Sequence, residues 1–242
     1  MQMRYLDRTL ATIEANLALD EALLVVAEER GGPAVLRQWE APEVVVVMGA
    51  SCRLRDEVRV EACREDGVAI VRRSTGGGTV VIGPGALNVA VVLPIDIAPG
   101  LEAVDVAQRF VLERMAKGLR TLEPNVEVLG SGDLTIDRRK FGGSAQRRLR
   151  KHFLVHVSLL YHFPLELVDR YTTLPRRQPA YRTGRSHHEF LMNLERAREQ
   201  IATVVHSSWI SPGPPIAANV PEALVDHLVA TKFGDPAWIG RL

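Results

Sequence analysis

The pattern of apolar and polar positions first predicts a helix near the start of the chain. Residues 13–30 carry apolar side chains at helical spacing, with polar side chains, among them Asn16, Asp20 and Glu21, between them. This period of about 3.6 residues is typical of an amphipathic helix. The Gly-Gly-Pro sequence at 31–33 should end that helix, because glycine and proline cannot easily continue it.

Short apolar runs between turn residues predict strands. They span residues 34–39, 44–49, 68–71, 79–82 and 86–93, and a mainly β pattern follows over 126–160. The run at 44–49 is so apolar that we expect both of its faces to be covered. We expect 79–82 and 86–93 to form one β-turn-β unit around Gly83-Pro84-Gly85, and a hairpin turn near Asp137-Arg138.

Helical spacing returns in four more segments, at residues 58–64, 101–122, 194–209 and 221–232. The prolines at 211–215 make a connection between helices that is too short to be a domain linker. No repeat or low-complexity segment interrupts the pattern. We therefore expect residues 1–242 to form a single α+β domain with a mixed β-sheet and flanking helices.

Composition and charge narrow the class of protein. The chain has 242 residues, is 46% apolar, and balances 30 basic against 29 acidic residues. That balance does not indicate a globally basic nucleic-acid-binding protein. No apolar run approaches the roughly 18 residues of a membrane span, and the two cysteines lack metal-ligand spacing. No signal-type leader opens the chain, so we expect a cytoplasmic protein with reduced thiols and neither a membrane nor a nucleic acid as partner.

The first candidate site is a glycine loop that follows the apolar run at 68–71. Its residues are Arg72, Arg73, Ser74, Thr75, Gly76, Gly77 and Gly78. Consecutive glycines let the backbone approach an anion and present N–H groups to it, while guanidiniums neutralise its charge. The loop lacks the spacing of the dinucleotide and Walker motifs. It predicts a phosphate or carboxylate site, with a plain glycine-rich hairpin as the alternative.

The second candidate site is Lys140, which lies in a stretch rich in basic residues. No acidic residue occurs between Asp137 and Glu166, whereas seven basic residues lie at 138–151, a composition that attracts anions. Lys140 is followed by Phe141-Gly142-Gly143-Ser144-Ala145-Gln146. Small neighbours leave room for a ligand beside the ammonium group, which can bind a carboxylate or phosphoryl oxygen. A solvated basic hairpin is the alternative, above all for residues 147–151.

Several motifs in order resemble one family, between about residue 13 and residue 235. They are the segments Asn16–Glu21, Val47-Met48-Gly49, Arg72–Gly78, Leu87-Asn88, Asp133-Leu134, Lys140–Gln146 and His156-Val157-Ser158-Leu159-Leu160. This set resembles the lipoate-protein ligase family, part of the biotin/lipoate ligase and octanoyltransferase superfamily. The resemblance implies its class II synthetase-like catalytic fold. Family members use MgATP to activate lipoate as an acyl-adenylate, then acylate a lysine of an acceptor lipoyl domain.

The resemblance also implies roles for individual residues. Lys140 would be the catalytic residue, contacting carbonyl and phosphate oxygens during adenylation and transfer. Asp133 would lie near the nucleotide and its Mg2+ ion, and the strands around Val45, Val71 and Val91 would line a narrow tunnel for the acyl chain. Lipoate or octanoate would be the acyl substrate. The residues expected to bind substrate and adenylate are Arg72, Arg73, Ser74, Thr75, Gly76, Gly77, Gly78, Asn88, Asp133, Gly143, Ser144, Ala145 and His156.

The chain departs from the family pattern at several places. Ser131-Gly132 stand before Asp133 in place of Arg-Asn, Ile82-Gly83 replace His-Asp, and Ala50-Ser51-Cys52 replace Arg-x-Gln after Gly49. The larger ligases add a C-terminal accessory domain, and we expect none here. Either a separate subunit completes the enzyme, or the minimal domain suffices, or the protein is a transferase.

The positions of the cysteines and histidines bear on whether the chain is a ligase, a transferase or a zinc protein. Relatives that transfer octanoyl groups from a carrier without ATP use a nucleophilic cysteine, and none lies between Cys63 and the end of the sequence. Cys52 is more typical of a buried structural thiol. His156 could equally be a core histidine, and no zinc-ligand spacing surrounds His187-His188. A non-catalytic module that binds acyl-adenylate or nucleic acid is the third possibility.

A third basic segment lies between Asp169 and Glu189, where acids are absent. It contains Arg170, Arg176, Arg177, Arg182 and Arg185. A solvated loop is one interpretation. The other is a docking surface for an acidic lipoyl domain, because complementary charge steers encounter.

Overall fold

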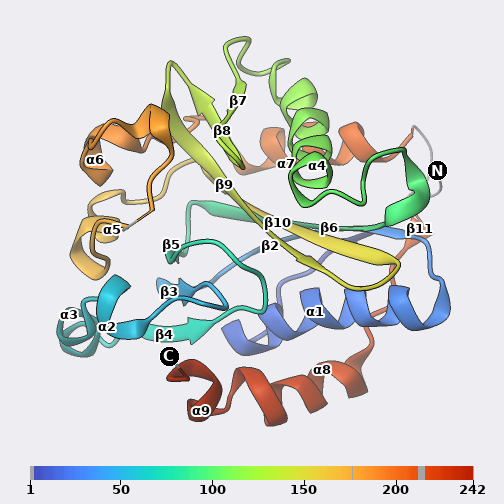
Figure 1. The fold of residues 1–242 in the computed structure, drawn as a ribbon, viewed down its shortest axis with the longest axis horizontal. Coiled ribbons are helices and arrows are strands. Elements are labelled where there is room, and N and C mark those ends of the chain that lie inside the picture. The colour runs from blue at the N-terminus through green and yellow to red at the C-terminus, as the bar shows by residue number, and fades with distance from the viewer. Residues whose placement is uncertain (1–2, 176, 212–215, 242) are drawn as a thin grey trace.

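The computed structural model describes residues 3–175, 177–211 and 216–241, arranged as in Figure 1. Its strands are β1 (Met3–Asp7), β2 (Ala34–Glu40), β3 (Val45–Met48), β4 (Ala69–Arg72), β5 (Val80–Ile82), β6 (Ala86–Pro94), β7 (Glu127–Leu129), β8 (Asp133–Ile136), β9 (Arg139–Arg148), β10 (His152–Leu160) and β11 (Ile216–Ala217). Eight of them form one sheet in the order β11-β1-β2-β6-β10-β9-β8-β7, and β4-β3-β5 form a smaller one. Parallel and antiparallel pairs both occur, so the predicted mixed sheet is confirmed.

Nine α-helices lie in the described part of the chain. They are α1 (Ile13–Arg30), α2 (Leu54–Glu57), α3 (Val60–Glu65), α4 (Val104–Leu119), α5 (Glu166–Tyr171), α6 (His187–Phe190), α7 (Arg198–Trp209), α8 (Glu222–Leu228) and α9 (Pro236–Ile239). A π-helical turn, Val229–Phe233, extends α8. The helix predicted at 13–30 is present with those ends, and the helices predicted at 58–64, 101–122, 194–209 and 221–232 are present with different ends. Within the described ranges, none is long and apolar enough to cross a membrane.

The large sheet separates two hydrophobic cores because its strands alternate their side chains between both faces. Leu87 and Val91 of β6 pack in the core that contains Val111 of α4. Ala90 and Val92, the intervening residues of the same strand, pack in the core that contains α1 and the small sheet. Figure 1 accordingly shows α4 and α7 on one side of the large sheet and α1 and α8 on the other.

Helix α1 differs from the predicted amphipathic helix with solvated polar residues. Asn16, Asp20 and Glu21 are buried. The reason is a set of partners inside the protein: Arg37 of β2, fully buried, donates to Asp20 Oδ1 at 2.5 Å and to Asn16 Oδ1 at 2.6 Å. Buried polar groups need such partners. The polar positions of α1 therefore attach it to the large sheet.

The predicted β-turn-β unit over residues 79–93 is wrong, because its two strands lie in different sheets. Strands β4 and β5 do not pair with each other, because β3 lies between them, parallel to β4 and antiparallel to β5. Strand β6 belongs to the large sheet, so the turn at 83–85 carries the chain from one sheet to the other. The expectation that both faces of β3 are covered is confirmed, since all four of its residues are buried.

Several elements were not predicted, namely β1, α2, α5, α6 and α9. Strand β1 pairs with β2 over Met3 to Asp7, although its sequence MRYLD has no clear alternation. The four helices span only four to six residues each, which is too short to show a helical period. Their positions depend on contacts between distant segments.

Substitution of Gly85 tests whether the turn at 83–85, which connects the two sheets, must pack closely against the backbone of His162. Its φ is +92°, and a Cβ there would lie 2.5 Å from the carbonyl carbon of His162. Gly85→Ala should therefore lower the free energy of unfolding by about 3 kcal/mol or more, since backbone strain and a backbone clash add. Gly67→Ala is the control, because Gly67 has φ +67° and open space around it, so only the strain of about 1–2 kcal/mol applies. Equal losses in urea unfolding would contradict the close approach.

Candidate active site

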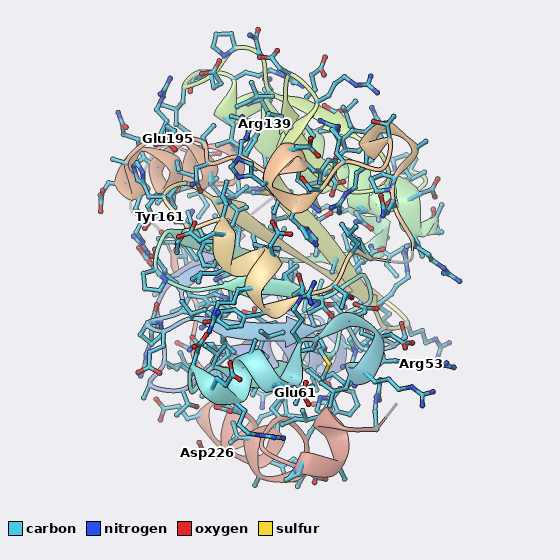
Figure 2. The ribbon with its side chains drawn as sticks, turned by 90° about the vertical axis from the view of Figure 1, so that its left-hand side faces the viewer. Arg53, Glu61, Arg139, Tyr161, Glu195 and Asp226 are labelled. Carbon is cyan, nitrogen blue, oxygen red and sulfur yellow. The ribbon has the colours of Figure 1, made fainter. Side chains whose placement is uncertain are left out.

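A cavity of about 870 Å3 lies where the two sheets, α1 and the segment between α5 and α6 meet. Leu17 of α1, Asn88 of the large sheet, Val81 of the small sheet and Phe190 of α6 all contribute to its wall. Figure 2 views the molecule from the side of α2, α3, α5 and α6, with Arg139 above these helices and Glu61 among them. Residues from across the sequence therefore converge on one hollow.

The floor of the cavity is a row of side chains across five strands of the large sheet. Pairing places Trp39 opposite Asn88, Asn88 opposite Ser158, Ser158 opposite Gly143, and Gly143 opposite Asp133. Directly paired residues point to the same face of a sheet, and all five line the cavity. Ser158 donates to Asn88 Oδ1 at 2.7 Å, which fixes the amide in the centre of this row.

A second row, beside the first, contains a buried histidine. His156 lies opposite Ala145, and both line the cavity. His156 Nε2 lies 3.4 Å from Asp20 Oδ2, which also accepts a hydrogen bond from Trp39 Nε1 at 3.2 Å. Burial lowers the pKa of His156, and the charge of Asp20 only partly opposes this. The imidazole is therefore neutral near neutral pH.

The glycine loop crosses the end of β3 on its way from β4 to β5. Arg73 N donates to Met48 O, and Ala50 N donates to Thr75 O, both at 2.9 Å. Gly49 is essential to this contact, because a Cβ there would lie only 1.9 Å from Gly77 O. The loop is therefore pressed against the strand that it crosses.

Arg73 is an internal brace of the loop. Its guanidinium donates to Thr75 Oγ1 at 2.9 Å, to Gly76 O at 2.6 Å and to Gly78 O at 2.7 Å, and also to Val47 O at 3.1 Å. Only 6% of Arg73 is exposed, and burial lowers its pKa to about 10. It forms no ion pair with any described residue, so its positive charge acts on the cavity that it lines.

Two backbone amides of the loop are available to a ligand. Gly77 and Gly78 line the cavity, and their N–H groups donate to no residue in the described ranges. Thr79, next in sequence, donates both its N–H and its hydroxyl to Glu57 Oε2, at 3.0 and 2.7 Å. The free donors therefore sit between two fixed points, as an anion-binding loop requires.

Four loop residues predicted to bind substrate lie outside the cavity: Arg72, Ser74, Thr75 and Gly76. Arg72 is the last residue of β4 and Arg73 the first of the loop, and their side chains bind different partners. The guanidinium of Arg72 is fully buried against carbonyls, including Cys52 O at 2.7 Å and Ile239 O at 2.7 Å. It therefore joins the C-terminal helix α9 to the base of the loop.

Lys140 faces the cavity beside Asp133. Its Nζ lies 2.6 Å from Asp133 Oδ1, and Tyr181 donates its hydroxyl to Asp133 Oδ2 at 2.7 Å. Gly143 leaves the room for this pair, since a Cβ there would lie 2.7 Å from Lys140 Nζ. Burial and the charge of Asp133 raise the pKa of Tyr181, which therefore remains a hydrogen-bond donor.

Ser144 lines the cavity, but its hydroxyl is turned toward α4. It donates to Gly132 O at 2.8 Å and accepts from Gln108 Nε2 at 2.7 Å. These bonds hold the turn that precedes Asp133. The side chain of Ser144 therefore supports the site from behind, which differs from the predicted contact with substrate.

The apolar part of the cavity wall differs in detail from the predicted tunnel. Val91 faces the other core, against α4, and Val45 and Val71 are buried without lining the cavity. The apolar lining includes Leu17, Val47, Val81, Ile82, Leu160, Val168, Phe190 and Leu191. The wall therefore uses the small sheet as expected, together with α1, α5 and α6, which the sequence did not bring together.

The arginine segment 170–185 is not a uniformly solvated surface. Arg170 pairs with Asp66, and Arg185 donates to the carbonyl oxygens of Arg138 and Tyr181. Arg182 is only 3% exposed and lines the cavity. Arg177 is exposed at the cavity, and Arg176 lies outside the described residues. Most of these guanidinium groups therefore bind other parts of the fold. Arg182 is buried, so it is not part of the surface proposed to dock an acidic lipoyl domain.

The donor set does not fit a metal ion held by the protein alone. In the described ranges no three histidine, cysteine, aspartate or glutamate side chains cluster as ligands. Both oxygens of Asp133, the expected Mg2+ ligand, already have hydrogen-bonding partners. Cys52 lines the cavity, where burial raises the pKa of its thiol, and Cys63 is buried elsewhere with its pKa likewise raised.

Several functional residues were missed from the sequence. Asp20, Glu57, Tyr181 and Gly49 hold the site together through contacts between distant segments. Asp20 and Gly49 lie in segments that carry the family resemblance but received no role from it, and nothing in the local sequence around Glu57 and Tyr181 indicates their partners. Ser158 could have been found, because it lies two positions from His156 on a predicted strand and so shares its face.

Comparison with known proteins identifies the family of this chain. The sequence profile described as "Lipoyl protein ligase A/B catalytic domain" matches residues 12–206. A putative lipoate-protein ligase A of Aeropyrum pernix is 34% identical over 60% of this chain and 52% of its own length. An octanoyl-[GcvH]:protein N-octanoyltransferase of Geobacillus kaustophilus is 30% identical over 67% of this chain and 61% of its own. The chain thus spans about half to three fifths of these curated relatives.

Solved structures show the same fold. The bi-partite lipoate protein ligase of Thermoplasma acidophilum, studied with its E2 lipoyl domain, has a TM-score of 0.85 at 22% identity, covering 100% of this chain and 98% of that one. A lipoate-protein ligase A bound with ATP has a TM-score of 0.84 at 21% identity, with full coverage of both chains. The fold predicted from the resemblance is confirmed, and with the profile match over most of its length, the chain belongs to the lipoyl protein ligase A/B catalytic-domain family.

Proposed function

We propose that this protein is a lipoate-protein ligase, which activates lipoate or octanoate with ATP and transfers the acyl group to a lysine of a lipoyl domain. One observation carries the proposal: Lys140, the free amides of Gly77 and Gly78, and an apolar wall border a single cavity. An acyl-adenylate has an apolar chain joined to an anionic phosphate, and these are the two environments that the cavity offers.

In the adenylation step, the carboxylate of lipoate attacks the α-phosphorus of ATP and pyrophosphate leaves. Both reactants are anions, so positive charge and N–H donors must offset their repulsion. Lys140 would contact the phosphate and carbonyl oxygens, and Gly77 and Gly78 would donate from the opposite wall. Arg73, braced inside the loop, would contribute its charge without touching the ligand.

In the transfer step, the amine of the acceptor lysine attacks the carbonyl carbon of the acyl-adenylate and AMP leaves. Lys140 would stabilise the negative charge that develops on the carbonyl oxygen and on the departing phosphate. The apolar side chains that line the cavity, among them Val47 and Leu191, would hold the acyl chain, so that the carbonyl stays beside Lys140. No covalent acyl-enzyme is needed.

ATP and lipoate are the substrates that this proposal requires. A relative of the same fold has been solved with ATP, and a T. acidophilum relative with lipoic acid. The residues that the structure describes hold no cluster of metal ligands, so any Mg2+ would come with ATP, held mainly by phosphate oxygens as is usual for this ion.

The acceptor would be a lipoyl domain, as the T. acidophilum ligase and its E2 lipoyl domain suggest. That ligase is bi-partite, which supports a separate accessory subunit for this chain as well. An acidic acceptor surface remains part of the proposal, with exposed Arg177 at the cavity as its nearest basic partner.

Octanoyl transfer without ATP is the second candidate, favoured by the 30% identity to the octanoyltransferase of G. kaustophilus. Such a reaction through a covalent intermediate needs a reactive thiolate. The two thiols of this chain, Cys52 and Cys63, are buried and their pKa values are raised. Thiols in such surroundings are protonated and inert, so the ligase is the better supported activity.

Replacing Lys140 tests the ligase directly. Lys140→Ala should reduce lipoate-dependent ATP–pyrophosphate exchange by about 100-fold or more, a magnitude typical for the loss of one donor to a developing charge. Thermal unfolding should show an intact fold. Lys151→Ala, which removes an exposed lysine of the same basic stretch, should exchange at the wild-type rate. Exchange retained in Lys140→Ala would refute the assigned role.

Gly49→Ala tests whether the glycine loop must lie against β3. The added methyl group would overlap Gly77 O and lift the loop. We expect the KM for lipoate and ATP in the exchange assay to rise by about tenfold or more, equivalent to about 1.4 kcal/mol. Gly32→Ala, whose methyl group would make an ordinary 3.6 Å contact, is the control. Unchanged kinetics in Gly49→Ala would show that this contact is dispensable.

Omitting ATP distinguishes the two candidate functions. A ligase should acylate a lipoyl domain only when lipoate, ATP and Mg2+ are all present. A transferase should work from an octanoylated carrier protein without ATP and pass through an acyl group on its own cysteine. Intact-protein mass spectrometry, with hydroxylamine to cleave thioesters, measures both. An ATP-independent, hydroxylamine-sensitive acyl adduct would overturn the ligase proposal.

A further inference from the structure

A single carboxylate beside the cavity binds two donors of different kinds. Asp133 Oδ1 lies 2.6 Å from the ammonium of Lys140, and Asp133 Oδ2 accepts the hydroxyl of Tyr181 at 2.7 Å. The side chain of Asp133 is 14% exposed, and Tyr181 is 8% exposed. Asp133 therefore has both of its oxygens satisfied and little contact with water.

This arrangement matters when Lys140 engages a ligand. Turning the ammonium toward a phosphate takes it away from Asp133, and a largely buried carboxylate that loses its cation is costly. A hydrogen bond to a charged group is worth more than a neutral one. Since the Tyr181 bond is made to the other oxygen, it can persist while Lys140 moves.

The position of the Tyr181 hydroxyl is fixed by packing. Gly130 (φ +58°) lies beneath the ring, where a Cβ would come within 3.3 Å of Tyr181 Cε1. The ring of Phe190 also packs against Tyr181, with the ring centroids 5.3 Å apart and the planes tilted by 40°. Tyr181 belongs to the segment between α5 and α6 that borders the cavity, so it joins this segment to Asp133.

We propose that Tyr181 is a positioning residue: its hydroxyl keeps Asp133 compensated, so that Lys140 can leave Asp133 and bind the phosphoryl and carbonyl oxygens of the ligand. Without the hydroxyl, Asp133 holds Lys140 more tightly and opposes its movement. The inference rests on the ligase function proposed above, and it assigns a role to a residue of the α5–α6 segment.

A second cluster of the same chemistry provides a matched control. Tyr171 donates its hydroxyl to Asp66 Oδ2 at 2.7 Å, and Arg170 Nη2 donates to Asp66 Oδ1 at 2.6 Å. Like the first, it consists of a tyrosine, a carboxylate and a cation. None of its three residues lines the cavity. Tyr171→Phe therefore removes an equivalent hydroxyl outside the cavity lining.

The first experiment compares these two variants in lipoate-dependent ATP–pyrophosphate exchange. Tyr181→Phe should lower kcat/KM by about tenfold or more, as expected for a hydrogen bond to a charged group, and Tyr171→Phe should stay within about twofold of wild type. Equal rates for Tyr181→Phe and wild type would overturn the proposal.

A double variant separates positioning from packing. With Asp133→Asn the carboxylate charge is gone, so the hydroxyl of Tyr181 has no charge left to compensate. Tyr181→Phe should then cost less than about twofold when added to Asp133→Asn, measured as a double-mutant cycle. A tenfold cost that persists in the Asp133→Asn background would mean that Tyr181 acts only through its packing.

A third measurement does not depend on turnover. Lysines can be dimethylated reductively with 13C-formaldehyde, which keeps their charge, and the Lys140 signal is the one missing from Lys140→Arg. Inorganic pyrophosphate, as the anion probe, should shift this signal at about tenfold higher concentration in Tyr181→Phe than in wild type or Tyr171→Phe. Equal titrations would overturn the positioning role. A Tyr181-dependent titration in a protein without lipoate-dependent exchange would keep it and refute the ligase function.

Discussion

The buried pair of Asp20 and Arg37 is the interaction on which the site depends most. It joins α1 to β2, and the same carboxylate orients Trp39 and lies beside His156. A buried pair of this kind adds little stability over apolar residues of similar volume, but loss of one partner costs about 3–5 kcal/mol. Its effect is therefore one of specificity: α1 can pack on the large sheet only where these partners meet, and that position sets one wall of the cavity.

The two parts of the candidate site come from different sheets. The glycine loop belongs to the small sheet, whereas Lys140 and Asp133 belong to the large one. Helix α1 packs in the same core as the small sheet, and its Glu21 binds Arg147 of β9 in the large sheet. The distance between the free amides of Gly77 and Gly78 and the ammonium of Lys140 is thus set by packing between the sheets, and substitutions far from the cavity can alter it.

The sequence predicted the helices and strands whose apolar residues recur at a regular spacing, and it singled out motifs whose residue types suit the binding of an anion. The long helices and the buried strand β3 were predicted in this way, and Lys140 and part of the glycine loop, singled out by their chemistry, line one cavity. What it could not supply were pairings between distant residues. Arg72 and Arg73 look alike in sequence, yet Arg72 at the end of β4 binds α9, whereas Arg73 at the start of the loop binds the loop itself. The polar side chains of α1 suggested exposure, and only the presence of Arg37 opposite them explains their burial.

The brace formed by Arg73 has a consequence for how a substrate enters. One guanidinium holds the carbonyls of Gly76 and Gly78 and that of Val47 in β3 at the same time. Despite its three glycines, the loop cannot unfold one residue at a time, since each bond lost leaves the same buried cation less satisfied. Opening would have to break these contacts together. The loop should therefore have two positions, one packed on β3 with all of these contacts made and one released from β3 with all of them broken.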